Sequence, residues 1–177
     1  MKIPHIIRIF LIFILLSSGM ACNENSSNRS EEDTAEVNRN DSLLQEKFNY
    51  PKIEIDLSEA ARNEAEEWML YVAIESEIKR MKNYNLDDVV SNAPSILRAS
   101  DTLLKTIPKK YRTKPIESRM KVLHTKASVL NQLSKQQQKD LEKLKEVAEE
   151  VPVDFFNLNI QLNEIYIEMP DLETLEK

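Results

Sequence analysis

The sequence predicts an all-α protein: an antiparallel bundle of three to four helices that follows an extended arm and a disordered tether. Two features of the composition support this prediction. Of the 177 residues, 31% are charged and 6% are aromatic, which is typical of amphipathic helices with solvated outer faces. The one glycine is Gly19. Because tight hairpin turns between strands usually require glycine or asparagine, the lack of glycine after residue 19 disfavours a β-rich fold.

Residues 1–21 have the pattern of a secretory signal peptide. Lys2 and Arg8 form a short basic start, an apolar run covers residues 9–16, and small residues lead up to Ala21. The apolar run is shorter than the roughly 20 residues that a transmembrane helix needs, so a cleaved signal is favoured over an uncleaved anchor. Removal of residues 1–21 changes the formal net charge from −6 to about −8.

The segment Gly19-Met20-Ala21-Cys22 resembles the lipobox of bacterial lipoproteins. The resemblance implies cleavage between Ala21 and Cys22, and attachment of acyl chains such as palmitate to Cys22. It also implies a lipid anchor in the cell envelope, in the outer membrane, with the protein facing the periplasm or the outside. Gly19 departs from the pattern, which usually has leucine, valine or isoleucine there. As the chain's single cysteine, Cys22 cannot form an internal disulfide in an oxidising compartment, and lipidation gives it a role.

Residues 23–47 are rich in asparagine, serine, glutamate and aspartate, and they lack the apolar periodicity of a folded element. We therefore expect residues 22–47 to form a disordered tether that begins at lipidated Cys22 and ends at a helical domain over residues 48–177. The acidic stretch Glu31-Glu32-Asp33 loosely resembles the acid-rich surface-export signal that follows the cysteine in some lipoproteins of the Bacteroidota. In architecture alone, the domain resembles the small helical lipoproteins of unknown function that are common in that group.

The domain is expected to begin with an extended arm over residues 48–55. Asp56 and Glu59 have the spacing of a capping box, which predicts a helix from there to about Asn83. Apolar residues on one stripe of this helix support it, namely Ala61, Ala65, Trp68 and Val72.

A second helix is predicted over residues 86–107, where apolar residues alternate at spacings of four and three. Pro94 interrupts this pattern. It either kinks the helix or lies in the first turn of a helix that begins near Asn92. Residues 109–114, between Pro108 and Pro115, are predicted to form a loop.

The third helix is predicted over residues 116–148, either as one long rod or as two antiparallel pieces that separate at residues 134–138. Because neither glycine nor proline interrupts it, continuity is favoured.

A fourth helix is predicted to begin at Pro152. Residues 156–163 alternate between apolar and polar in the manner of a strand, and so do residues 52–57, so the two segments could pair as strands. Helix is favoured for residues 156–163 because the alternation fails after residue 163 and because an isolated two-stranded ribbon is only marginally stable.

The sequence contains few residues that could form a catalytic or metal centre. After residue 21 it has one histidine, His124, and no cysteine except Cys22, so zinc sites built from histidine and cysteine and Cys-His catalytic pairs are excluded. A di-iron bundle requires glutamate three residues before histidine, but Lys121 occupies that position before His124. We predict that His124 lies at the edge of the core and that three acidic pairs are solvated surface, namely Glu66-Glu67, Asp87-Asp88 and Glu149-Glu150.

These observations predict a protein that is not an enzyme and has no catalytic residue, no cofactor and no bound metal. Its partners are expected to be the membrane, through the lipid anchor, and another protein, while the negative net charge disfavours nucleic acid. An alternative is a helical bundle that binds a small molecule or a metal ion, either through carboxylates or in a cavity lined by Trp68, Tyr71 and Phe155. At their helical spacing, however, these aromatic residues are expected to belong to the core.

Overall fold

The structure is a computed structural model that describes residues 38–167. The predicted signal peptide, cleavage at Ala21, lipidation of Cys22 and the segment 168–177 lie outside the described residues. Contacts divide the chain into two units, Met1–Arg39 and Asn40–Lys177, and the features below belong to the second. The elements within its described residues are helices, with no strand among them, so the all-α prediction is confirmed. None of these described helices is long and apolar enough to cross a membrane.

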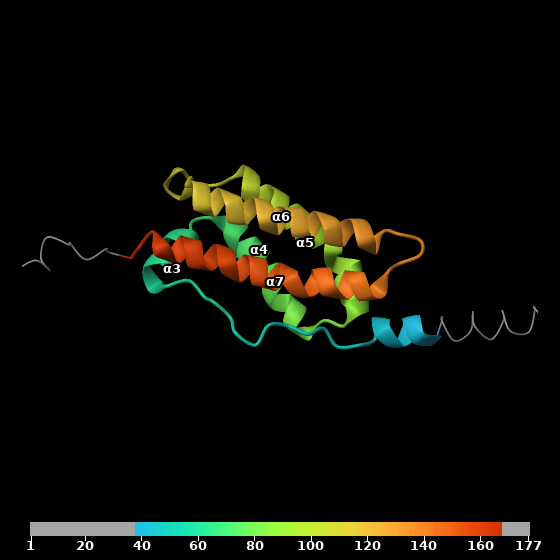
Figure 1. The fold of residues 1–177 in the computed structure, drawn as a ribbon. Coiled ribbons are helices and arrows are strands. Elements are labelled where there is room, and N and C mark those ends of the chain that lie inside the picture. The colour runs from blue at the N-terminus through green and yellow to red at the C-terminus, as the bar shows by residue number, and fades with distance from the viewer. Residues whose placement is uncertain (1–37, 168–177) are drawn as a thin grey trace, which may run out of the picture. The chain divides into compact units, whose positions relative to one another are not determined.

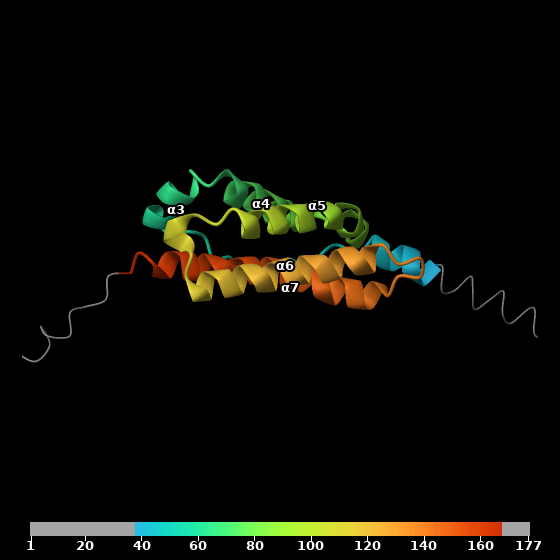
Figure 2. The same cartoon turned by 90° about the horizontal axis from the view of Figure 1, so that it is seen from above.

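The helices follow a short helical segment that includes residues 40–44, and they pack into a bundle (Figure 1). In order they are α3 (Glu59–Ala65), α4 (Met69–Arg80), the 3-10 turn η1 (Met81–Asn83), α5 (Leu86–Lys105), the 3-10 turn η2 (Lys109–Tyr111), α6 (Lys114–Ser134) and α7 (Leu141–Glu164). The helix α6 packs against α5 and α7, and α4 packs against the same two helices. Figure 2 shows α6 and α7 in one layer and α4 and α5 in the other.

The prediction of a single helix over residues 56–83 is wrong, because the chain breaks between α3 and α4. Ser58, and not Asp56, caps α3: its hydroxyl accepts a hydrogen bond from the backbone N–H of Ala61 at 3.3 Å. Trp68 lies at the break with its side chain buried. Burial of this large ring outweighs the local preference of the segment for continuous helix.

The helix α5 matches the prediction closely at its N-terminus, where Asn85 and Asp88 form a capping box. Pro94 lies inside this helix, so the alternative of a helix that begins near Asn92 is wrong. The predicted loop over residues 109–114 contains the turn η2 and the first residue of α6.

The prediction of a continuous helix over residues 116–148 is also wrong, since α6 ends at Ser134 and α7 begins at Leu141. The carboxylate of Asp140 accepts a hydrogen bond from the backbone N–H of Lys143 at 2.9 Å, so an N-cap starts α7 without glycine or proline. Pro152 lies inside α7 and does not begin a separate helix. Residues 156–163 are helical, which confirms the preference for helix over strand there.

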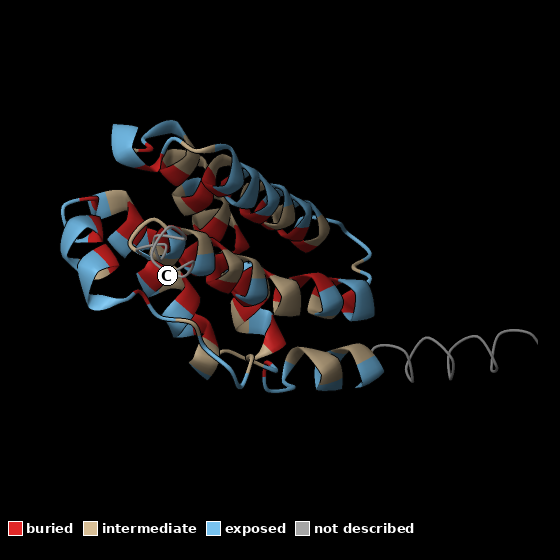
Figure 3. Cartoon of the chain, turned by 60° about the vertical axis from the view of Figure 1, so that its left-hand side comes forward, coloured by how far each residue is buried: buried red, intermediate tan, exposed pale blue. Residues whose placement is uncertain are grey.

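The core is one cluster of buried side chains that extends from Phe48 to Leu162 along the chain (Figure 3). Within it the ring of Trp68 stacks on Tyr111, with centroids 5.8 Å apart, and Tyr71 stacks on Phe155 at 5.7 Å. Trp68, Tyr71 and Phe155 therefore belong to the core, as predicted. Val72 does not, because it is 37% exposed.

The predicted tether does not extend to residue 47. Residues 40–44 are helical, and Leu43 and Leu44 pack against the core. The backbone N–H of Leu86 donates to the carbonyl of Glu46 at 3.1 Å. These contacts supply the apolar burial that the composition of the segment did not reveal, so residues 40–47 belong to the folded unit.

Candidate binding groove

A groove lies between α7 and residues 48–57, which we call the arm. The arm runs along α7 without forming helix or strand (Figure 1). The groove has a volume of about 770 Å³. It is lined by Asn49, Tyr50, Pro51, Lys52, Ile53 and Ile55 of the arm and by Glu146, Glu149, Glu150, Val153, Phe156, Asn157 and Ile160 of α7.

Two asparagines of α7 hold the C-terminal half of the arm. The side-chain amide of Asn159 donates to the carbonyl of Ile55 at 2.7 Å and accepts from the hydroxyl of Tyr71 at 2.8 Å. One helical turn later, the amide of Asn163 donates to the carbonyl of Asp56 at 3.0 Å and accepts from the backbone N–H of Ser58 at 2.8 Å. Asn159 and Asn163 are thus two of the polar positions in the alternating residues 156–163, and their side chains bind the backbone of the arm.

The N-terminal end of the arm is fixed against α5 and α7. The backbone N–H of Phe48 donates to the carbonyl of Tyr84 at 2.9 Å, and Lys47 forms an isolated β-bridge with Asn85. Glu46 pairs with Lys145 of α7 at 2.6 Å. The arm is thus attached at both ends, and its middle residues form one wall of the groove.

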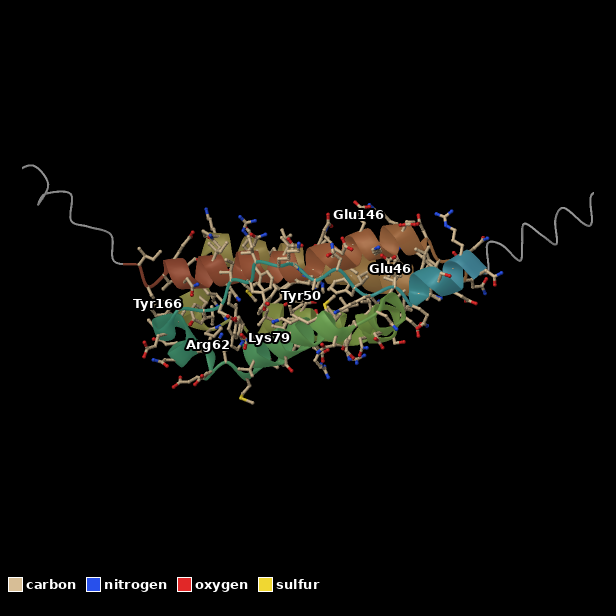
Figure 4. All side chains as sticks on the ribbon, turned by 90° about the horizontal axis from the view of Figure 1, so that it is seen from below. Glu46, Tyr50, Arg62, Lys79, Glu146 and Tyr166 are labelled. Carbon is tan, nitrogen blue, oxygen red and sulfur yellow. The ribbon has the colours of Figure 1, made fainter. Side chains whose placement is uncertain are left out.

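An ion-pair cluster around one buried carboxylate, that of Glu75, lies at the C-terminal end of the arm, where Figure 4 shows Arg62 and Lys79. Glu75 of α4 accepts two hydrogen bonds from Arg62, at 3.0 and 3.3 Å, and one from Lys79 at 3.0 Å. The carboxylate of Asp56 lies 3.6 Å from the Lys79 ammonium. Burial raises the pKa of Glu75, but the hydrogen bonds and charges of Arg62 and Lys79 outweigh it and hold that pKa below its ordinary value.

Tyr50 lies in the groove between the arm and α7. Its ring packs edge-on against Phe156, with centroids 6.1 Å apart, and the Lys82 ammonium lies 5.4 Å from its centroid. Burial, and then the charges of Glu54 and Asp56, raises the pKa of the Tyr50 phenol. This hydroxyl is buried without a hydrogen-bond partner among the described residues, and its raised pKa keeps it protonated.

The surface of the groove combines apolar side chains with carboxylates. Ile53 is 78% exposed, Val153 44% and Ile160 39%. Glu146, Glu149 and Glu150 lie together towards the N-terminal half of α7. A ligand in the groove could therefore make apolar contacts with the exposed side chains and ionic contacts with the carboxylates.

The three acidic pairs of the sequence have different surroundings in the structure. Glu149 and Glu150 line the groove, whereas Glu66 and Glu67 lie at the break after α3. Asp88 caps α5, which is a structural role. Within residues 38–167 no group of three or more histidine, cysteine, aspartate or glutamate side chains could hold a metal ion.

His124 is half-buried, with its Nδ1 atom 3.4 Å from the Ser100 hydroxyl, which agrees with the predicted position at the edge of the core. The groove itself was not predicted. The one signal was the alternating pattern of residues 52–57 and 156–163, which as two strands could have paired. The two segments do lie side by side, but as an extended arm held by the asparagines of a helix. Comparisons with protein-family models, with characterised proteins and with solved structures find no match for this chain.

Replacing Asn159 should release the arm. In Asn159→Ala the carbonyl of Ile55 and the hydroxyl of Tyr71 lose their partner inside the protein, which should lower the free energy of unfolding in urea by about 2 to 4 kcal/mol. Trypsin should also cut after Lys52 faster than in the parent chain. The matched variant Asn157→Ala, on the same helix, should change stability by less than about 0.5 kcal/mol. Equal effects of the two variants would contradict the role given to Asn159.

The Glu75 cluster should make stability depend on pH. A carboxyl whose pKa is lowered by folding contributes stability above its unfolded pKa, and this is lost as pH falls through the folded pKa. We expect Glu75→Gln to be less stable than the parent by roughly 1 to 2 kcal/mol at neutral pH, and the difference should shrink as the pH falls below 4.5, the ordinary pKa of glutamate. Urea unfolding at several pH values measures it. Glu64→Gln, at an exposed pair with Lys110, should change stability by less than about 0.5 kcal/mol at every pH.

Proposed function

We propose that this chain is a lipid-anchored protein of the cell envelope that acts as a non-enzymatic binding module. In this proposal an antiparallel four-helix bundle presents the groove between the arm and α7 to another protein. The observation that carries it is the groove, where exposed apolar side chains and carboxylates lie on a frame attached at both ends. Binding sites for proteins often combine an apolar centre with polar groups at the rim.

The anchor rests on the sequence. The signal-like residues 1–21 and the lipobox-like segment that ends at Cys22 favour acylation of this cysteine. Two or more acyl chains give stable attachment, since each buried CH₂ contributes about 0.8 kcal/mol. We place the protein in the outer membrane, facing the periplasm or the outside.

A second candidate function is the binding of a small molecule in the same groove. Its volume of about 770 Å³ lies within the usual range for small-molecule sites, roughly 300 to 1,000 Å³. Thermal-shift screening distinguishes the two candidates: a small molecule that raises the melting temperature, with the increase lost in Ile160→Ser, favours this second function.

Lipidation predicts a specific labelling pattern. Cells that express the full chain and grow with an alkyne-tagged palmitate should incorporate the tag into the protein, and Cys22→Ser should abolish the label. A variant at an exposed serine of the helical unit, Ser118→Ala, controls for expression and should keep it. Labelling that survives Cys22→Ser would show that the lipobox resemblance is misleading. Protease shaving of intact cells, with a periplasmic protein as integrity control, then tells which side the folded unit faces.

If the groove binds another protein, a photoreactive residue inside the groove should crosslink to that protein, and one outside it should not. A photoreactive benzoylphenylalanine in place of Ile53 should crosslink to another protein in living cells. The same group in place of Met69, which is 71% exposed on α4 and outside the groove, should give no such product. Similar products from both positions would indicate non-specific contact and contradict the proposed role of the groove.

A further inference from the structure

The two ends of the groove differ in chemistry. Glu146, Glu149 and Glu150 line one end, while Val153 and Ile160 continue along the same helix. From residue 146 to residue 160 an α-helix rises by about 21 Å, which is the length of about six residues of extended peptide. A site of this length fits a segment of polypeptide better than it fits a compact small molecule.

The acidic end carries an excess of negative charge. Two of its three carboxylates pair with lysines outside the groove, Lys126 and Lys143. Glu149 has no ion pair within 4 Å in the described part of the chain, since the neighbouring ammonium, that of Lys145, pairs with Glu46 and feels Glu149 through its charge alone. The groove lining contains one basic residue, Lys52. A cationic group at this end would therefore complement the local charge.

The other end offers apolar surface. Ile53 projects from the arm with 78% of its surface exposed, and Ile160 of α7 is 39% exposed. Both residues line the groove, from opposite walls. Apolar side chains of a peptide could cover them and remove this surface from water.

We infer that the groove binds a polypeptide segment of a partner protein that carries lysine or arginine at one end and apolar side chains at the other. The inference rests on the proposed binding function of the groove and adds the chemistry of the partner. The basic end lies against Glu146, Glu149 and Glu150, and the apolar end covers Ile53 and Ile160. Charge at one end and apolar contact at the other fix the direction in which the segment lies.

Fluorescence anisotropy with designed peptides tests the inference. The full chain is reconstituted in phosphatidylcholine nanodiscs, with empty nanodiscs as the blank, and titrated into fluorescein-labelled Lys-Lys-Ala-Leu-Val-Ala-Leu. Two comparison peptides replace both lysines by glutamate or the apolar residues by serine. We expect the first peptide to bind at least tenfold more tightly than either comparison peptide, and its affinity to fall as salt is added.

Groove variants locate the binding. Glu146→Gln/Glu149→Gln/Glu150→Gln should weaken binding about tenfold, as expected for three partly exposed ion pairs. A control with the same net charge, Glu66→Gln/Glu67→Gln/Glu164→Gln, should bind within about twofold of the parent chain. Among apolar residues, Ile53→Ser should weaken binding and Met69→Ser should not. Because Ile53 and Met69 are both exposed, both of these variants should keep the circular dichroism and melting temperature of the parent.

Each outcome of these titrations decides the inference. Tighter binding of the lysine peptide that depends on the groove supports it. Equal binding of the glutamate peptide, an equal effect of groove and control variants, or no binding at all overturns it. Sedimentation that shows self-association through the groove also overturns it, because the occupant is then a second copy of the chain. If the peptides fail but benzoylphenylalanine at Ile53 still crosslinks to a protein in cells, the proposed function stands and only the partner chemistry is wrong.

Discussion

The hydrogen bonds of Asn159 on α7 connect this helix to α4 and to the arm, and the packing of these three segments depends on them. Its side chain is almost fully buried, accepts from the hydroxyl of Tyr71 on α4 and donates to the carbonyl of Ile55 on the arm. A buried amide that loses such partners costs far more free energy than one hydrogen bond contributes when it is made. Because Tyr71 also stacks on Phe155 in the core, any displacement of the arm would disturb the packing of α4 on α7.

The groove is a consequence of how the arm is attached. Backbone contacts near Phe48 hold one end, and Asn159 with Asn163 holds the other. Between these points the arm has side-chain contacts, chiefly the packing of Tyr50 on Phe156, and lacks the regular backbone ladder of a sheet. Lys52 and Ile53 consequently remain exposed, and the space between them and α7 is open to a partner.

Much of the fold could be predicted from the sequence, because apolar spacing determines which face of a helix is buried. The spacing in residues 86–107 predicted α5 to within two residues. The spacing that begins at Ile116 predicted the buried face of α6, although the predicted helix continued across the break after Ser134. The breaks could not be predicted in the same way. Trp68 interrupts a helix through burial of its ring, and Asp140 starts one through an N-cap, whereas proline, the expected helix breaker, lies inside α5 and α7 at Pro94 and Pro152.

The candidate site was harder to predict than the fold because its two walls lie far apart in the sequence. The pair Glu149-Glu150 was interpreted as solvated surface, and no periodicity shows that the arm lies beside it. The asparagines at 159 and 163 are polar residues on one face of a helix, and their pattern alone suits a solvated helix or a strand equally well. Their role depends on the carbonyls of Ile55 and Asp56, which only the folded chain brings near.

Exposed apolar side chains occur elsewhere on this protein, so exposure alone does not distinguish the groove. Val122 and Val129 of α6 lie in a depression of about 310 Å³, but all of its lining residues come from that single helix. Isolated apolar residues on a helix surface are ordinary in folded proteins. In the groove, by contrast, apolar side chains from two distant segments face one space, and hydrogen bonds hold both walls in place. A preorganised site of this kind loses less conformational entropy on binding, so it favours a partner more strongly than a single exposed helix face does.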